Sequence, residues 1–115
     1  MSQPINIGSV DDIPAGEARV LDGGDNSTGV DISIFHAEDG NFYALDDECT
    51  HEEASLADGF IEDAQVECPL HAAAFCLKTG KALCLPATEN ARTHRVEVRD
   101  GELILYPGEP APTQD

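Results

Sequence analysis

The sequence predicts an all-β domain, built as a small antiparallel β-sandwich or partly open barrel. Short stretches in which apolar and polar residues alternate are typical of strands with one buried face. Turn sequences that contain Gly, Asn or Asp separate these stretches. Sustained helical periodicity is absent, and only a single helical turn is expected, near residues 12–16 or 54–56. Short strands between turn signals favour a sandwich or a barrel.

The first predicted hairpin spans residues 30–45. Within residues 30–35, apolar side chains stand at every second position, which predicts a strand. The sequence Glu38-Asp39-Gly40-Asn41 has the composition of a turn, and residues 42–45 return as the next strand. We expect this second strand to lead into the first of two loops that carry Cys and His residues.

Two shorter hairpins are expected in the middle of the chain. One lies near Val66-Glu67 and would deliver the second of these loops, which starts at Cys68. The other forms around the turn Lys78-Thr79-Gly80-Lys81, between two short strands that contain Phe75 and Leu85.

The strongest hairpin signal lies near the end of the chain. Residues 93–99 alternate again, Asp100-Gly101 is typical of a two-residue hairpin turn, and residues 102–106 form the returning strand. The first residues of the chain and the Pro-rich tail, residues 107–115, are expected to be frayed and flexible.

A chain of 115 residues is expected to form a single domain over residues 1–115. The part that carries the two loops, about residues 45–86, is expected to be a small subdomain. We find no repeat and no second domain. The N-terminus has neither the basic nor the apolar region of a signal peptide, and no apolar run is long enough to span a bilayer. A soluble, cytoplasmic protein without membrane contact is therefore expected.

The charge is strongly acidic, with 23 Asp and Glu residues against 6 Lys and Arg residues and a net charge of −17. This balance argues against nucleic-acid binding, which requires a basic surface, and against an anionic membrane. A protein partner with a basic docking face agrees better with it. Acidity that serves only solubility, or a salty habitat, explains the net charge equally well.

Two short motifs carry the chemistry. Cys49-Thr50-His51 and Cys68-Pro69-Leu70-His71 each offer one thiol and one imidazole, and sixteen residues separate them. Two Cys and two His form the ligand set of a 2Fe–2S centre in which both His bind one iron. The same set can also hold a structural zinc ion, although zinc modules usually begin with two Cys separated by two to four residues. The four cysteines do not follow the close spacing of a plant-type cluster.

The residues around these motifs resemble a known family. Cys-Thr-His and Cys-Pro-Leu-His are typical of Rieske-type ferredoxins, and the chain resembles the soluble kind that serves bacterial ring-hydroxylating dioxygenases. The resemblance covers most of residues 42–106, including residues 54–59, 71–75, 79–83 and 85–87. Two differences stand out. Glu52 replaces a frequent Gly, and Ala72-Ala73 replace the usual Gly-Gly.

The resemblance implies one Rieske-type 2Fe–2S cluster clamped between two loops. Cys49 and Cys68 would bind the inner iron, whereas His51 and His71 would bind the outer iron, close to solvent. The two histidines would then be the points where electrons leave. The fold implied is the Rieske-like antiparallel β-sandwich or partly open barrel, with its small cluster-binding subdomain.

Two features of these loops predict the reduction potential. High-potential Rieske proteins carry an extra Cys in each loop, whereas this chain has Ala54 or its neighbour, and Leu70, at the matching positions. The potential is therefore expected at the low end of the Rieske range, about −150 mV. Two thiolates and two neutral imidazoles leave the oxidised cluster uncharged, whereas four thiolates would leave it doubly negative, so reduction costs less than in an all-thiolate cluster.

A group of acidic residues flanks the first motif. We interpret them as a docking rim for a basic partner, because charge close to the electron exit can steer association. A simple solvated loop face, screened by salt, is the alternative. The residues of this rim are Asp46, Asp47, Glu48, Glu52 and Glu53.

The resemblance implies electron transfer as the function, and the sequence shows no nucleophile–base pair, phosphate loop or acid–base dyad that would indicate an enzyme. We interpret the chain as a carrier and not an enzyme. The resemblance implies that it takes single electrons from an NAD(P)H-dependent flavoprotein reductase. It would pass them to a terminal Rieske non-haem iron oxygenase that hydroxylates aromatic rings in hydrocarbon catabolism. The alternatives are the Rieske-like small subunit of an assimilatory nitrite reductase and a ferredoxin that serves another type of oxygenase.

The remaining Cys and His residues are not expected to bind metal. Cys76 and Cys84 flank the turn at residues 78–81 and are interpreted as half-buried strand residues without a function, since a cytoplasmic environment keeps thiols reduced. His36 and His94 lie on predicted strands away from both motifs and are interpreted as ordinary sheet residues.

Overall fold

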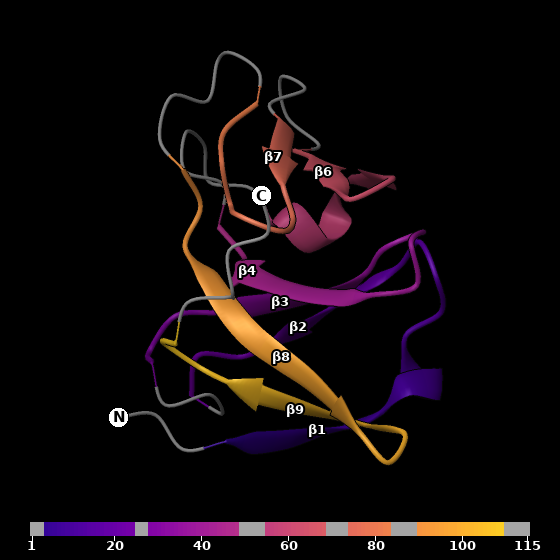
Figure 1. Ribbon diagram of the computed structural model, residues 1–115. Coiled ribbons are helices and arrows are strands. Elements are labelled where there is room, and N and C mark those ends of the chain that lie inside the picture. Colours follow the sequence, from indigo (N-terminus) through magenta and orange to yellow (C-terminus); the bar gives the residue numbers. More distant parts are fainter. Residues whose placement is uncertain (1–3, 25–27, 49–54, 69–73, 84–89, 110–115) are drawn as a thin grey trace.

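The computed structural model describes residues 4–24, 28–48, 55–68, 74–83 and 90–109. These residues form two antiparallel sheets, a large one of six strands and a small one of three, and Figure 1 shows the small sheet above the large one. The large sheet has the strand order β1-β9-β8-β4-β3-β2, and its strands are β1 (Ile5–Ser9), β2 (Ala18–Leu21), β3 (Ile32–His36), β4 (Phe42–Asp46), β8 (Thr93–Arg99) and β9 (Glu102–Tyr106). The small sheet has the order β5-β6-β7, with β5 (Phe60–Glu62), β6 (Gln65–Glu67) and β7 (Ala74–Cys76).

The all-β prediction is confirmed, and the large sheet has the expected partly open form. Its edge strands β1 and β2 do not pair with each other, so the curled sheet is a half-barrel. Two 3₁₀ turns complete the described elements, η1 (Val10–Asp12) and η2 (Leu56–Asp58), each two residues from an expected helical turn. Ser9 caps η1 by accepting a hydrogen bond from the backbone of Asp11.

The strand predicted over residues 30–35 starts two residues later than expected. Val30 lies before β3 and is 45% exposed. The alternating pattern also predicted one solvated face, whereas all four residues from Ile32 to Phe35 are buried. Ile32 and Ile34 face the inside of the half-barrel, and Phe35 belongs to a second cluster on the other face. Both faces of β3 are covered because η2 and the small sheet pack on the second one.

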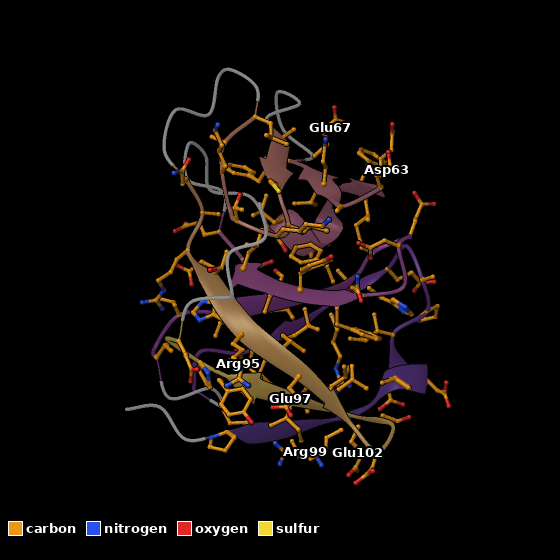
Figure 2. The ribbon with its side chains drawn as sticks, in the orientation of Figure 1. Asp63, Glu67, Arg95, Glu97, Arg99 and Glu102 are labelled. Carbon is orange, nitrogen blue, oxygen red and sulfur yellow. The ribbon has the colours of Figure 1, made fainter. Side chains whose placement is uncertain are left out.

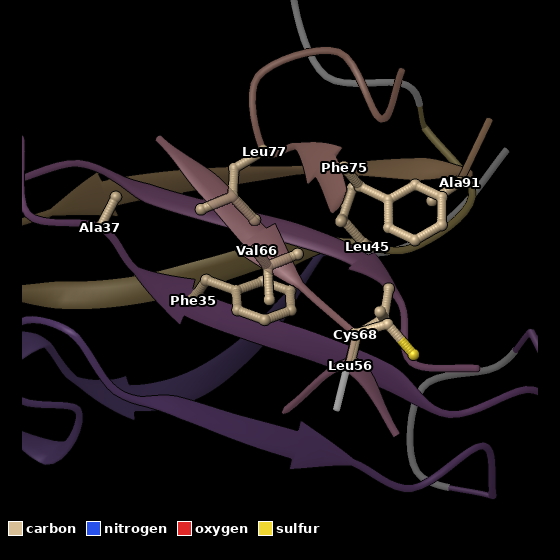
Figure 3. Close-up of a cluster of buried hydrophobic side chains, with 9 residues drawn as sticks. All are labelled: Phe35, Ala37, Leu45, Leu56, Val66, Cys68, Phe75, Leu77 and Ala91. Carbon is tan, nitrogen blue, oxygen red and sulfur yellow. The ribbon is translucent and has the colours of Figure 1, made fainter. Parts of the chain in front are cut away.

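Two apolar clusters form the core. The inner cluster fills the half-barrel and consists of the buried residues Ile13, Ile32, Ile34, Ala44, Leu103 and Leu105. The bridging cluster joins the large sheet to the small one, and Figure 3 shows its nine buried residues. These are Phe35, Ala37, Leu45, Leu56, Val66, Cys68, Phe75, Leu77 and Ala91. Because adjacent residues of a strand point to opposite faces, β4 supplies Ala44 to the inner cluster and Leu45 to the bridging one.

The predicted hairpins are present where the structure describes them. Asp100 and Gly101 have φ angles of 53° and 79°, as a tight two-residue turn with both central residues left-handed requires. The hairpin near Val66 is formed by β5 and β6. At residues 78–81, the backbone N–H of Gly80 donates to the Cys76 carbonyl at 2.7 Å, which closes the expected turn after β7. The strand expected at Leu85 lies outside the described residues.

Both chain ends are hydrogen-bonded to strands of the large sheet, as far as they are described. β1 pairs with β9 from Ile5 onward. In the tail, the backbone N–H of Gly108 donates to His94 Nδ1 at 2.8 Å, and the Arg95 N–H donates to the Glu109 carbonyl at 2.8 Å. Gly108 and Glu109 are therefore hydrogen-bonded to β8; residues 110–115 lie outside the described part. None of the described helices is long and apolar enough to cross a membrane.

Candidate metal centre

Of the four predicted ligands, the described part of the chain includes one, Cys68. It follows β6, is 1% exposed and belongs to the bridging cluster. Figure 3 shows it at the edge of that cluster, beside Leu56. Cys49, His51 and His71 lie outside the described residues, in segments 49–54 and 69–73.

Strand pairing holds the two ends of the second segment, residues 69–73, next to each other. Glu67 pairs with Ala74 across β6 and β7, so residues 69–73 begin and end at adjacent strands. The pairing also explains why Cys68 is buried: Val66 is buried, Glu67 is exposed and Cys68 is buried again, as the period of a strand demands. A thiol at this position is shielded from solvent, as expected for a ligand to an inner iron.

The first segment is closed in a similar way. An isolated antiparallel bridge joins Glu48 to Ser55, and the Leu56 N–H donates to the Asp47 carbonyl at 2.7 Å. Residues 49–54 therefore begin and end side by side, just after β4 and just before η2.

The stems of the two segments are in contact with each other. Leu56, after the first segment, and Cys68, before the second, both belong to the bridging cluster. Gly59, directly after η2, lies so close to β6 that a Cβ atom there would be 2.1 Å from the Glu67 carbonyl oxygen. Only glycine allows this approach without a backbone shift. The fold thus brings the stems of both Cys-His segments into contact with each other.

Asp47 is not a surface residue, contrary to its assignment to an acidic rim. Its side chain is 7% exposed, and its Oδ1 accepts hydrogen bonds from Ser33 Oγ, from Ser55 Oγ at 2.8 Å and from the Ala57 N–H at 3.1 Å. The sequence alone did not reveal these contacts, because Ser33 is separated from Asp47 by one strand and a turn.

Asp46, the second member of that rim, interacts with two basic side chains. His94 Nε2 donates to its Oδ1 at 2.6 Å, and Arg92 Nε lies 3.4 Å from the same oxygen. Burial acts to raise the pKa of the Asp46 carboxyl, but the hydrogen bond from His94 and the charge of Arg92 outweigh it and hold the pKa below its ordinary value. Glu48, another predicted rim residue, is exposed, and its side chain forms no ion pair or hydrogen bond with the described residues. The remaining two, Glu52 and Glu53, lie outside the described residues.

The lowered pKa of Asp46 predicts a specific pH dependence of stability. A carboxyl whose pKa is depressed by folding stabilises the protein above its ordinary pKa, here 3.8, and this contribution disappears as the pH falls through the folded value. Asp46→Asn should therefore be less stable than the wild type from pH 7 to pH 5, by a constant difference in free energy of unfolding. The difference should shrink below pH 3.8. Urea unfolding of both proteins across this range tests it; an equal difference at pH 3 and pH 7 would contradict it.

His94 and His36 have structural contacts, in agreement with the sequence interpretation. His94 is fully buried, and because its Nδ1 accepts from the Gly108 N–H, its Nε2 carries the proton that is donated to Asp46. His36 donates from Nδ1 to the Ile13 carbonyl at 2.7 Å and stacks on Phe42, with 4.1 Å between the ring centroids. The role of His94 in connecting β4, β8 and the tail was not visible in the sequence.

Cys76 is half-buried on β7, as expected, and Cys84 lies outside the described residues. Burial acts to raise the pKa of the Cys76 thiol, but hydrogen bonds from Thr79 and from the Lys78 backbone outweigh it, so the pKa is lowered. In the described part of the chain, no three His, Cys, Asp or Glu side chains are grouped as a metal site.

Comparison with known proteins identifies relatives over nearly the whole chain. The model of the Rieske [2Fe-2S] domain matches residues 3–106. A 3-phenylpropionate/cinnamic acid dioxygenase ferredoxin subunit of Photorhabdus laumondii is 48% identical over 106 residues, which is 91% of this chain and 94% of the relative. The corresponding subunit of Escherichia coli K12 is 50% identical over 97 residues, or 84% of this chain and 86% of the relative.

Solved structures agree with these sequence relatives. The ferredoxin of carbazole 1,9a-dioxygenase from Nocardioides aromaticivorans matches with a TM-score of 0.82 at 28% identity, covering 92% of this chain and 99% of that one. A complex of reduced oxygenase and oxidised ferredoxin in carbazole 1,9a-dioxygenase matches equally well, over 95% of this chain and 96% of the other. The nitrite reductase small subunit of Mycobacterium tuberculosis reaches a TM-score of 0.80 at 18% identity over 91% of this chain and 95% of that subunit, which shows the fold alone.

Proposed function

Since the chain belongs to the Rieske [2Fe-2S] domain family and is the electron-carrying ferredoxin of a dioxygenase system with one 2Fe–2S cluster, we propose that two sequence motifs bind this cluster. The proposed ligands are Cys49, His51, Cys68 and His71. The main support for the assignment is the contact between the two segment stems. Gly59 packs against the backbone carbonyl of Glu67, the residue directly before Cys68.

The donor chemistry of these residues fits the cluster. Thiolates at Cys49 and at Cys68, which is buried, would bind the inner iron, and neutral imidazoles at His51 and His71 would bind the outer iron. The bound cluster supplies reversible uptake of one electron. The protein's own contribution is to hold both segments at their stems and, through the bridging cluster, to exclude water from the Cys68 side.

EPR spectroscopy tests the ligand set. After anaerobic reduction with dithionite, we expect a rhombic signal whose average g value lies clearly below that of all-thiolate clusters, and a potential near −150 mV, roughly the low end of the Rieske range. His71→Cys should move the signal toward the all-thiolate type. A colourless protein with stoichiometric zinc and no EPR signal would overturn the proposal.

The relatives suggest the chemical class of the oxygenase substrate. The two sequence relatives at about half identity serve dioxygenases of 3-phenylpropionate and cinnamic acid. The terminal oxygenase served by this ferredoxin would accordingly hydroxylate the ring of an aryl-substituted carboxylic acid, with electrons drawn from a cytoplasmic NAD(P)H-dependent flavoprotein reductase. Reconstituted turnover of 3-phenylpropionate that depends on this ferredoxin supports the assignment. Turnover of unsubstituted aromatic hydrocarbons alone contradicts it.

Docking to the oxygenase is proposed to be transient and electrostatic, with Glu48 and the two neighbouring acids Glu52 and Glu53 as the acidic rim. A net charge of −17 and the exposure of Glu48 beside the first motif support this. Asp46 and Asp47 are left out of this rim because their carboxylates are bound within the protein.

A charge-neutral variant tests the rim. Glu48→Gln should slow electron transfer to the oxygenase by about two- to fivefold at low salt and leave the rate at high salt unchanged, because salt screens rim charges. Glu102→Gln is the matched control: Glu102 is exposed on β9, and Figure 2 shows it at the opposite end of the molecule from Glu67, the residue before Cys68. Equal rates for the two variants at low salt, at equal potentials, would disprove the rim.

A further inference from the structure

We propose that Asp47 is a positioning residue that sets the geometry of the first cluster-binding segment from inside the protein. The proposal rests on the ligand assignment above, because the segment that Asp47 holds contains Cys49 and His51. One carboxylate connects both ends of this segment to each other and to the central strand β3.

Asp47 contacts the end of the segment through its side chain. Its Oδ1 accepts from Ser55 Oγ at 2.8 Å and from the Ala57 N–H at 3.1 Å, so the first residues after the segment are held at a residue before it. The Asp47 carbonyl accepts from the Leu56 N–H at 2.7 Å. Six residues, 49–54, are thus closed at their base by several hydrogen bonds to a single residue.

The same residue is anchored to the large sheet. Ser33 Oγ, which is fully buried on β3, donates to Asp47 Oδ1, and the Asp47 N–H donates to the Asp31 carbonyl at 2.9 Å. β3 is covered on both faces and lies inside the sheet between β2 and β4. A rigid strand therefore holds Asp47, and Asp47 holds the segment.

Asp47 has unusual partners for a buried acidic side chain. Within the described residues, no Lys, Arg or His side chain forms an ion pair with it, whereas Asp46 next to it has two basic partners. Burying an acidic side chain is costly unless hydrogen bonds compensate, and Asp47 Oδ1 accepts three hydrogen bonds from described residues. Such bonds hold their donors in well-defined directions. We therefore assign to this carboxylate the orientation of the segment that leads to the inner-iron ligand Cys49.

A purely structural role of Asp47 leads to a different expected result. If Asp47 only stabilised the fold, its loss would lower the resistance to urea and leave the properties of a bound cluster unchanged. A positioning role requires that the cluster itself responds, through its g values, its potential and its rate of loss. These readouts separate the two roles.

The experiment compares three variants of the full-length protein loaded with its cluster. Asp47→Ala removes the acceptor, Asp47→Asn keeps an acceptor oxygen of the same shape without the charge, and Ser55→Ala removes one donor. We expect cluster loss under an iron chelator to be at least about tenfold faster in Asp47→Ala, the scale typical of residues that orient metal ligands. Its EPR signal should broaden or shift. Asp47→Asn should restore most of the lifetime, and Ser55→Ala should be intermediate.

Asp58→Asn is the matched control. Asp58 is exposed, lies on η2 directly after Ala57, and loses the same charge without a described hydrogen bond to the segment. It should keep the wild-type g values and rate of cluster loss.

Two results would overturn the proposal. The first is an Asp47→Ala protein with wild-type g values, potential and rate of cluster loss. The second applies if Asp47→Ala does not fold: Ser55→Ala would then have to lose its 2Fe–2S cluster faster than Asp58→Asn and show altered g values, and equality of these two variants would reject the proposal. Failure of the ligand assignment is distinguishable, because the wild type itself would then lack the Rieske EPR signal.

Discussion

Cys68→Ser is expected to lose the 2Fe–2S cluster almost completely, so that its iron and sulfide content and its visible absorbance fall to background. The thiolate is a proposed ligand to the inner iron, and a neutral hydroxyl binds iron much more weakly. The substitution also places a hydroxyl in the bridging cluster at a position that is 1% exposed, which costs about 1–3 kcal/mol in free energy of unfolding. Iron and sulfide analysis together with EPR provides the measurement.

Cys76→Ser is the control for this prediction. Cys76 is the other described cysteine, and it lies half-buried on β7, after the second segment. It should keep a full cluster with wild-type g values. A Cys76→Ser protein without a cluster, or a Cys68→Ser protein with one, would show that the wrong thiol has been assigned.

Phe75→Ala is expected to lower the free energy of unfolding by about 3–5 kcal/mol, a large part of the roughly 5–15 kcal/mol typical of a domain. Phe75 is fully buried, pairs with Val66 across β6 and β7, and belongs to the bridging cluster that holds the small sheet on the large one. Removing its ring leaves a cavity between the two sheets. Urea unfolding followed by circular dichroism measures the loss.

The retention of the 2Fe–2S cluster should decrease together with the stability, because β7 begins directly after the second segment, residues 69–73. We expect Phe75→Ala to release its cluster faster than the wild type. Phe60→Ala is the matched control, since Phe60 lies on β5 of the same small sheet but is 67% exposed. It should change the free energy of unfolding by less than about 0.5 kcal/mol. Similar losses for both variants would show that the bridging cluster does not stabilise the domain.

The parts of the fold that could be predicted depend on local interactions. The turn at Asp100-Gly101 follows from the left-handed backbone that a tight hairpin needs, and the strands on both sides of it follow from their alternating residues. β1 was missed because the stretch from Ile5 to Ser9 has a weak pattern and includes a shift in register around Gly8. β2 was missed too, since Ala18–Leu21 is short and two of its residues are exposed.

The sequence predicted the cluster type of the candidate site, which the family confirms, but not the surroundings of the site. Two Cys-His motifs with family-specific neighbours indicate both the cluster and the electron-carrying function, because ligand type and spacing are local properties of the chain. The acidic rim was predicted to include Asp47, which is buried, and Asp46, whose carboxylate pairs with His94 and Arg92. Their partners His94 and Ser33 come from other strands, and no local pattern reveals such pairing.

The sequence by itself determined the strand content, the main hairpins, the type of cluster and the family of this protein, all of which depend on residues close together in the chain. Only the tertiary structure decided that β3 is buried on both faces, that Gly59 brings the two segment stems together and that the Asp47 carboxylate points inward. These features depend on contacts between distant residues, and the packing of the small sheet on the large one creates them. An exposed and a buried aspartate look the same in a sequence, because their difference lies in what the rest of the chain places around them.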